Sequence, residues 1–352
     1  MNQLDYKENG IGYVRYFAAI SVMTLHFASL YMKYCNDSND LFADLFRGIA
    51  VSVPGVVIFF AISGYLAMAS LEKKTFREYC VNKITRIYPE YWLCTIINIV
   101  VILWLASNML DSSFAVWIVT QFFGVANTPN CLKGFATGSV NGPLWTVFVQ
   151  MQIFILLGIM SKLLRRISVF KWGMLILASI AMNGLCRFIS DKYTAGIVSK
   201  LIERTFFPYF FWALIGALIF RYKEYIIPVL KKIWWVVLIV LLGIGYLTYY
   251  DPGVLNYGYY SGIITGILTP LFALGLSYAL PSKRVKDISY SIFLYQWIVM
   301  NVIIYFDLFN KWNVLICLLS FVIGTLILSI ISSMIIGRIN IIINIKRRMG
   351  HG

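Results

Sequence analysis

The apolar residues of this chain fall in long blocks that are separated by short polar stretches. Each block is about 18–25 residues long, the length that a helix needs to cross a hydrocarbon core of roughly 30 Å. The short alternating segments of an outer-membrane barrel are not seen. A shorter stretch, 113–125, is expected to be interfacial or re-entrant. The pattern predicts an all-α fold, a polytopic membrane helical bundle of about ten transmembrane helices, near residues 11–31, 48–70, 88–108, 143–162, 170–189, 206–220, 233–250, 258–280, 288–306 and 313–336.

The distribution of charged residues predicts how the helices are oriented in the membrane. Only 13% of the residues are charged, whereas a soluble domain has about a quarter, and yet the net charge is +15. In a membrane protein such an excess of Lys and Arg indicates basic cytoplasmic loops and not nucleic-acid binding. With both termini in the cytoplasm, every second loop is basic, which requires an even number of helices.

One membrane domain accounts for most of the chain. No internal repeat or long polar linker divides it, so we expect a transmembrane domain over 1–340 and a basic cytoplasmic tail over 341–352. The N-terminus lacks a basic region followed by a cleavage site, which predicts that the first apolar block is a retained helix. We expect a multi-pass protein of the cell (plasma) membrane. Nothing in the sequence indicates its oligomeric state.

The six cysteines show no CxxC spacing and no Cys/His cluster, so the sequence predicts no metal site. Cys35 and Cys131 both fall in predicted exterior loops. They could form a disulfide, but two unrelated free thiols are the simpler expectation.

Two ionisable residues interrupt the first predicted helix, "VRYFAAISVMTLHFAS". At about 100° per residue, the eleven residues from Arg15 to His26 return to within roughly 20° of one direction, about 16 Å along the axis. Both side chains therefore share a face, with Arg15 near the cytoplasmic surface and His26 about mid-bilayer. Because a charge facing lipid costs several kcal/mol, we expect the pair to line a polar cavity.

Each of these residues also has a simpler explanation. Arg15 could reach anionic headgroups, and His26 could make an interhelical hydrogen bond. His26, however, is the only histidine outside the C-terminal tail. With an unperturbed pKa of about 6.5, it can accept a proton from a hydroxyl and return it. The pair thus predicts proton chemistry, which suits a proton-coupled transporter as well as an enzyme.

The segment "FREYCVNKITRIYPEYW" carries a pair of cations. Lys83 and Arg86 are three residues apart and share one helix face at the cytoplasmic surface, where they could hold a phosphate-bearing ligand. Positive-inside bias explains them without a ligand. Pro89 is expected to open the next helix, with Glu90 as a favourable charge in its first turn.

Two later segments place small or polar residues inside apolar helices. Ser63, in "FFAISGYL", stands where small residues let helices approach closely. In "NGPLWTVFVQMQIF", Asn141 begins a turn and Trp145 lies at the exterior interface. Gln150 and Gln152 follow within the membrane, where amides must pair, most simply with another helix.

Together these segments resemble the acyltransferase-3 family of integral-membrane acyltransferases, whose members acylate surface polysaccharides, O-antigens, peptidoglycan and some small molecules. Arg15 and His26 fit the family's Arg–x10–His motif on the first helix. The segments "FFAISGYL", "KITRIYPEYW", "GPLWTVFVQMQIF", "FFPYFFWALIGALI" and "ISYSIFLYQWIV" are similar to further family segments and occur in family order.

The resemblance implies about ten helices and a cytoplasmic acetyl-CoA or other acyl-CoA as donor substrate, with no permanently bound cofactor. It also implies that His26 is catalytic, as the base that deprotonates the acceptor hydroxyl or as a covalent acyl carrier. The other expected site residues would hold anionic parts of the donor (Arg15, Lys83 and Arg86) or shape the acceptor side (Asn141, Trp145 and Gln150).

Three positions depart from the family pattern. Lys83 replaces an arginine and loses bidentate phosphate geometry. Gln150 stands where a glutamate is frequent, and Gln296 where a histidine is frequent; both keep hydrogen-bonding capacity and lose titration. These changes indicate either a different acceptor or a loss of transferase chemistry, and the retained Arg15 and His26 favour the former.

The leading hypothesis is an O-acyltransferase that moves an acetyl or other short acyl group from cytoplasmic acyl-CoA to a hydroxyl of a surface polysaccharide or its lipid-linked precursor. Its expected partners are acyl-CoA, the glycan acceptor and membrane lipids. The alternative is a transporter or flippase that uses the same cavity, although the paired half-repeats typical of transporters are not found. A catalytically silent membrane partner is a third hypothesis, consistent with the two glutamine replacements.

Overall fold

The computed structural model describes residues 9–36, 41–125, 127–193, 196–250, 257–281 and 287–349. For Phe42, Tyr249, Tyr250 and residues 340–349 it describes the backbone alone. Within these residues the chain is helical and contains no strand, which confirms the predicted all-α fold. The helices form two compact units.

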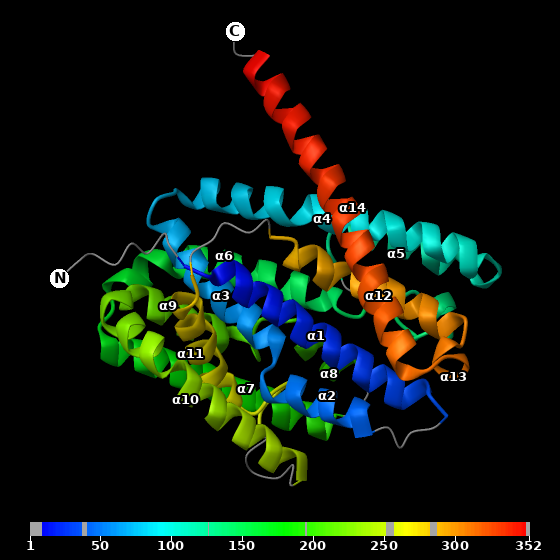
Figure 1. Ribbon diagram of the computed structural model, residues 1–352. Coiled ribbons are helices and arrows are strands. Elements are labelled where there is room, and N and C mark those ends of the chain that lie inside the picture. The colour runs from blue at the N-terminus through cyan, green and yellow to red at the C-terminus, as the bar shows by residue number, and fades with distance from the viewer. Residues whose placement is uncertain are drawn as a thin grey trace. The chain divides into compact units, whose positions relative to one another are not determined.

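The first unit comprises Met1–Ser29, Asp40–Asn82 and Trp145–Asp287. Within it, α3 packs along α9, and α10 packs along α11 and α2 (Figure 1). Its helices are most of α1 (Ile11–Tyr34), α2 (Leu41–Ser52), α3 (Gly55–Leu71), most of α6 (Leu144–Arg166), α7 (Val169–Lys192), α8 (Ile197–Glu203), α9 (Phe210–Arg221), α10 (Lys223–Tyr250) and α11 (Ile263–Ala279).

Glycines bring α3 and α9 into backbone contact. A Cβ on Gly64 would lie 1.9 Å from the carbonyl oxygen of Ala213, and one on Gly216 would lie 2.0 Å from that of Ala61. The two contacts are reciprocal, since each helix offers a glycine to an alanine of the other. Small residues permit this approach in membrane helices, and the expectation for the Ser63 segment is confirmed.

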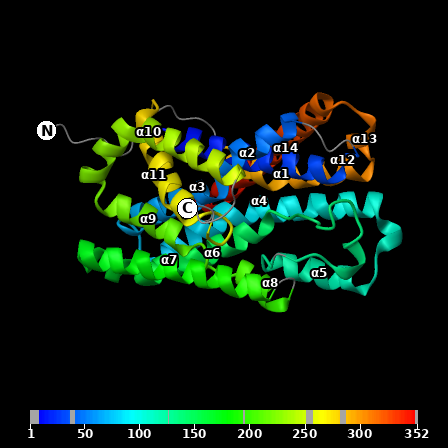
Figure 2. The ribbon, with the colours of Figure 1, turned by 90° about the horizontal axis from the view of Figure 1, so that it is seen from below.

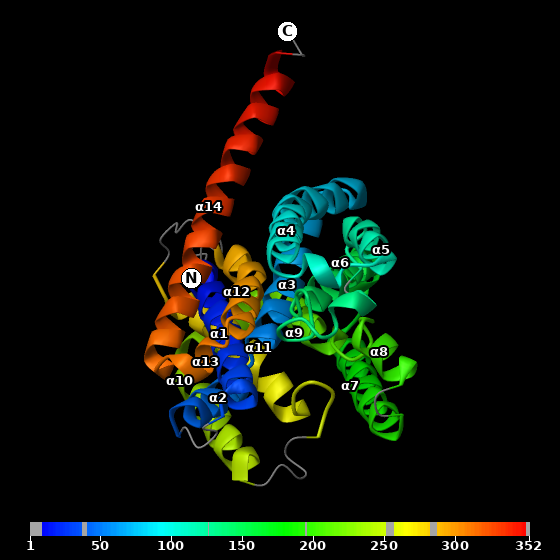
Figure 3. The same cartoon turned by 90° about the vertical axis from the view of Figure 1, so that its right-hand side faces the viewer.

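The second unit comprises Leu30–Asn39, Lys83–Leu144 and Ile288–Gly352. In this unit α12 packs along α14 (Figure 3). Its elements are the end of α1, most of α4 (Phe76–Leu105), the short 3₁₀ turns η1 (Ser107–Met109) and η2 (Asn130–Leu132), α5 (Ser112–Phe122), α12 (Ser289–Tyr305), α13 (Leu308–Lys311) and α14 (Val314–Met349).

The segment between α4 and α6 has a small core of its own. Phe114 and Trp117 of α5 belong to one buried cluster with Ile102 at the end of α4 and with Leu132, and Figure 2 shows α5 beside α4. Asp111 caps α5 by accepting from the backbone N–H of Ser113 at 2.8 Å. With 11 residues, α5 is too short to span a membrane comfortably, as the sequence predicts. A loop follows it.

Seven helical segments in the described part of the chain are long and apolar enough to cross a membrane, and one of them comprises α2 and α3 together. Three shorter apolar helices, α9, α11 and α12, coincide with the remaining predicted spans. A multi-pass helical membrane protein is thereby confirmed, whereas the count of ten and the cytoplasmic termini stay predictions. The predicted boundary at residue 340 falls inside α14, and the side chains of the tail lie outside the described residues.

Two predicted helix boundaries are wrong. The segment 48–70 is two helices, because the chain breaks at Val53–Pro54 between α2 and α3. Conversely, Pro89 does not open a helix: α4 runs from Phe76 through Pro89 without interruption. Membrane helices tolerate an internal proline where neighbouring groups satisfy the freed carbonyl.

Candidate active site

The first helix brings Arg15 and His26 onto one face. Because α1 is continuous from Ile11 to Tyr34, the two side chains keep the predicted separation of about three turns along a common direction. Both are half-buried. Between them, the hydroxyl of Ser21 donates to the carbonyl of Val53 at 2.7 Å, which fixes α1 against the break between α2 and α3.

Arg15 is paired within the first unit. Its guanidinium Nη1 donates to Oδ2 of Asp287, and the two side chains are 16% and 23% exposed. Asp287 stands two residues before α12, but no side chain caps that helix. A carboxylate 272 positions away in the sequence therefore holds the cation. An anionic ligand group that reached Arg15 would have to share it with Asp287 or displace that carboxylate.

The two amides on α6 both have partners in the first unit. Nε2 of Gln150 donates to the hydroxyl of Ser63 on α3. Gln152 spans the loop before α9, since its Nε2 donates to the carbonyl of Arg204 at 2.8 Å and its Oε1 accepts from the N–H of Phe206 at 3.1 Å. An interhelical partner was correctly predicted for Gln150, whereas Gln152 instead positions a loop.

Trp145 belongs to an aromatic cluster. Its ring centroid lies 4.9 Å from that of Tyr209 and 5.6 Å from that of Tyr260. Tyr209 in turn stacks on Phe60 of α3 at 5.8 Å. The indole thus joins the start of α6 to the loops that precede α9 and α11.

In the second unit, Lys83 and Arg86 occupy one face of α4. Since α4 is regular through both positions, their spacing of three residues places them one above the other, as predicted. Lys83 is half-buried and Arg86 is exposed. That these two cations hold a phosphate-bearing ligand stays a prediction.

Asn141 is buried in the second unit and is 7% exposed. Its Nδ2 donates to the carbonyl of Leu294 at 3.0 Å and points at Sγ of Cys94 at 3.5 Å. Its Oδ1 has no hydrogen-bond partner among the described residues. The amide therefore ties the turn before α6 to α12 and leaves one acceptor atom unused.

Sequence reasoning missed a buried carboxylate of the second unit. Glu90 lies in the interior of α4, not at a helix N-terminus, and is 7% exposed. Its Oε1 accepts from the hydroxyl of Ser332, which also accepts from the hydroxyl of Tyr295 at 2.7 Å. The sequence does contain a signal for Glu90. If the helix is extended through Pro89, this carboxylate falls within an apolar span.

The predicted site residues are thus distributed over both units. The first unit carries Arg15, His26, Trp145 and Gln150, and the second carries Lys83, Arg86 and Asn141.

In the part of the chain that the structure describes, neither the cysteines nor the metal-ligating groups form a second site. Cys35 and Cys131 are free thiols, in agreement with the expectation from the sequence; the first donates to the carbonyl of Phe309 at 3.6 Å, and the second accepts from the hydroxyl of Ser113 at 3.4 Å. Within the described ranges, no group of three His, Cys, Asp or Glu side chains could hold a metal ion.

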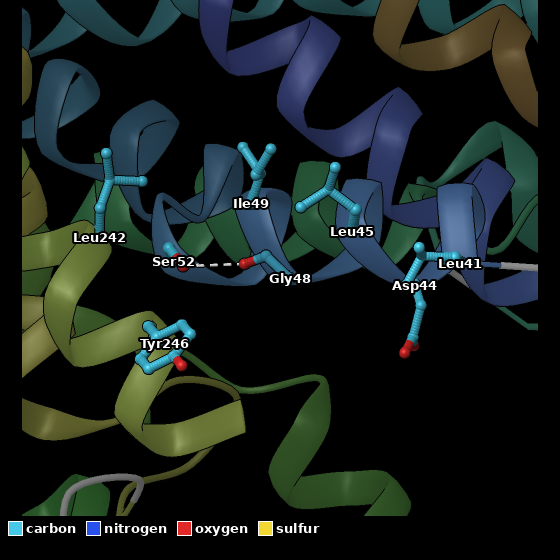
Figure 4. A pocket seen from close by; sticks show the side chains of 9 residues that line it. Leu41, Asp44, Leu45, Gly48, Ile49, Ser52, Leu242 and Tyr246 are labelled. Carbon is cyan, nitrogen blue, oxygen red and sulfur yellow. Dashed lines mark hydrogen bonds between the residues drawn. The ribbon is translucent and has the colours of Figure 1, made fainter. Parts of the chain in front are cut away.

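A cavity of about 480 Å³ lies between α2 and α10 in the first unit (Figure 4). Leu45, Ile49 and Leu242 make most of its wall apolar, and Asp44 and Tyr246 add polar atoms. None of the predicted site residues lines it, so it is not part of the candidate active site.

The chain is similar in sequence to a known protein family and to two relatives. A family model described as an acyltransferase domain, acyltransferase-3, matches residues 8–337. Nodulation protein 10 of Rhizobium leguminosarum bv. viciae is 26% identical over 336 residues, covering 86% of this chain and 86% of that protein. An O-acetyl transferase of Shigella phage Sf6 is 24% identical over 135 residues, covering 37% of this chain and 40% of that protein. No solved structure matches the chain.

Proposed function

Because this chain belongs to the acyltransferase-3 family of membrane acyltransferases, we propose that it transfers an acetyl or other short acyl group from cytoplasmic acyl-CoA to a hydroxyl of a surface polysaccharide or its lipid-linked precursor. The proposal locates the protein in the plasma membrane, where a donor from one side and an acceptor from the other can meet within one bundle. The similarity to a phage O-acetyl transferase supports an oxygen acceptor.

One observation carries the proposal. Arg15 and His26 lie on the same face of a continuous helix, and an internal carboxylate, Asp287, holds the guanidinium. A charged pair and a titratable imidazole along one face of a membrane helix require a polar environment within the protein. Such an environment suits an anionic donor at one end and a proton transfer at the other.

The proposed chemistry uses the imidazole as a proton carrier. His26 accepts the hydroxyl proton of the acceptor as its oxygen attacks the thioester carbonyl. The carbon–sulfur bond then breaks, and the departing CoA sulfur takes the proton back from the imidazolium. Arg15, Lys83 and Arg86 supply positive charge for the phosphates of the donor. Asn141, Trp145 and Gln150 would contact the acceptor.

The test measures thiol release from acetyl-CoA by the purified protein in lipid nanodiscs, with and without envelope glycan. We expect glycan-dependent release that falls at least about 100-fold in His26→Ala, since general acid–base catalysis contributes roughly 10²–10⁴-fold. Ile20→Ala is the matched control, because Ile20 is on the same helix and is 56% exposed.

A near wild-type rate in His26→Ala would refute the assignment of the base. Slow His26-dependent release without glycan would favour an acyl-enzyme route. Absence of release despite CoA binding would instead indicate a different acyl donor or a silent member of the family.

A further inference from the structure

A second cavity, of about 380 Å³, lies in the first unit where α7 ends. Its volume falls within the range of small-molecule sites, roughly 300–1,000 Å³. Its lining consists of aromatic, charged and hydroxyl side chains, namely Arg187, Ser190, Asp191, Ser199, Glu203, Tyr209, Tyr259 and Tyr260. Basic residues precede α7 at the predicted cytoplasmic side, so the end of α7 is predicted to lie at the exterior side, where a surface glycan would reach it.

Buried amides fix the loops that form this cavity. Asn183 of α7 is fully buried, and its Nδ2 donates to the carbonyls of Pro208 at 2.7 Å and Tyr259 at 3.3 Å. Its Oδ1 accepts from the N–H of Tyr259 at 3.0 Å. The next residue, Tyr260, has a left-handed backbone with φ of 69°. Such strain costs about 1–3 kcal/mol and is found preferentially at binding sites.

The charges in the cavity select against an anionic ligand. Nε of Arg187 donates to Oδ2 of Asp191 at 2.8 Å, so the positive charge of that guanidinium is balanced by a neighbouring carboxylate. Glu203 adds a second carboxylate, which leaves the group with a net negative charge. Phospholipid headgroups and the phosphates of CoA would therefore be repelled.

The remaining groups match a sugar ring. Tyr259 is half-buried and Tyr260 is 42% exposed, so both rings can supply apolar surface, whereas Tyr209 is fully buried behind them with its ring centroid 5.8 Å from that of Tyr259. The hydroxyl of Tyr259 can both donate and accept a hydrogen bond. The hydroxyls of Ser190 and Ser199 lie 2.7 Å apart and join α7 to α8. Carboxylates and hydroxyls beside aromatic faces complement a ligand with polar edges and apolar faces.

The geometry points to this cavity as a binding subsite for a neutral saccharide unit of the acceptor glycan, an inference that rests on the proposed function. Trp145, expected from the sequence to serve the acceptor, packs against Tyr209 and Tyr260, two of the rings that line the cavity. The subsite therefore adjoins a residue of the predicted acceptor side and would hold the polymer while another unit reacts.

The experiment measures glycan binding in the absence of acyl-CoA, which separates it from the test of catalysis. Oligosaccharides are released from the envelope polysaccharide of the source cells and divided by anion exchange into neutral and anionic fractions. Each fraction is titrated calorimetrically into the full-length protein in nanodiscs. We expect the neutral fraction to bind, and Glu203→Gln and Arg187→Gln to weaken it about tenfold each, the effect of losing one charge-assisted hydrogen bond.

Lys200→Gln is the matched control, because Lys200 is an exposed residue of α8 that does not line the cavity. It should bind the neutral fraction as the wild type does. If Glu203→Gln fails to fold, Tyr259→Phe removes only a hydroxyl and should weaken binding about threefold.

Unchanged binding in these variants would overturn the subsite, as would binding confined to the anionic fraction or displacement by free CoA. Thiol release in the presence of glycan should stay at the wild-type rate in Lys200→Gln. Absence of acyl transfer by the wild type, with intact saccharide binding, would refute the proposed function without refuting the subsite.

Discussion

Different kinds of contact hold the helices together within each of the two units. In the first, helices meet backbone to backbone: besides the reciprocal pair of α3 and α9, a Cβ on Gly55 would lie 2.1 Å from the carbonyl oxygen of Ala18. In the second, Gly142 and Gly324 face side chains, those of Trp297 and Val299. There, amides make the connections, and Asn301 alone contacts three residues of the segment before α6.

The difference follows from what each unit must stabilise. Regular helices satisfy their own backbone hydrogen bonds, so they gain most from close van der Waals packing, which small residues allow. The second unit contains an irregular segment between α4 and α6 whose carbonyls lack helical partners. Backbone groups of this kind need hydrogen bonds from elsewhere in the protein. The contact between α3 and α9 in the first unit therefore depends on glycine, and the irregular segment of the second unit depends on side-chain amides.

The largest predicted effect is at the glycine contact. Gly64→Ala would place a methyl group where the carbonyl of Ala213 now lies, so α3 and α9 would have to separate. We expect a loss of about 3 kcal/mol or failure to fold, since overpacking a tight core costs about 1–3 kcal/mol and occasionally more. Unfolding can be followed by dye labelling of the buried thiol of Cys186 in the same unit.

Gly243→Ala is the control for that variant. Gly243 lies in α10, and a Cβ at this position would meet no other atom within 4 Å, so alanine should be tolerated. Because alanine is the better helix former by up to about 1 kcal/mol, stability should be unchanged or higher. Equal losses in the two variants would contradict the importance of the α3–α9 contact.

Local patterns in the sequence predicted the helices and the relation between Arg15 and His26, because both depend on the geometry of one continuous helix. They failed at Glu90, where a proline was interpreted as a helix start. They also could not pair Arg15 with Asp287, because that ion pair joins positions 272 residues apart. Contacts of this range depend on how helices pack, which the spacing of residues along one helix does not specify.

The intermediate effect is at the amide that holds the irregular segment. Nδ2 of Asn301 donates to the carbonyls of Ser139 at 3.1 Å and Val140 at 3.0 Å, and its Oδ1 accepts from the hydroxyl of Thr137 at 2.7 Å. Asn301→Ala would leave these groups without that partner. We expect a loss of about 2 kcal/mol, within the cost of an unsatisfied buried group. Labelling of the buried Cys94 thiol reports on this unit.

Asn98→Ala tests whether any buried amide would have the same effect. Nδ2 of Asn98 donates to the carbonyl of Cys94, one turn earlier on its own helix, and so joins no separate segments. We expect a loss of about 0.5 kcal/mol or less, because alanine also favours the helix. If Asn98→Ala were as destabilising as Asn301→Ala, the amides would matter through burial alone and not through the segment that they hold.

The smallest effect on stability is expected at a polar contact of the first unit, the hydrogen bond between Gln150 and Ser63. A double-mutant cycle with Gln150→Ala and Ser63→Ala should give a coupling of about 0.6 kcal/mol, the average for polar pairs between membrane helices. Thiol labelling measures stability, and thiol release from acetyl-CoA measures activity in the same variants. If activity falls only in proportion to stability, Gln150 serves packing between α6 and α3. A larger fall in activity, with the KM for glycan raised, would assign its amide to the acceptor as well.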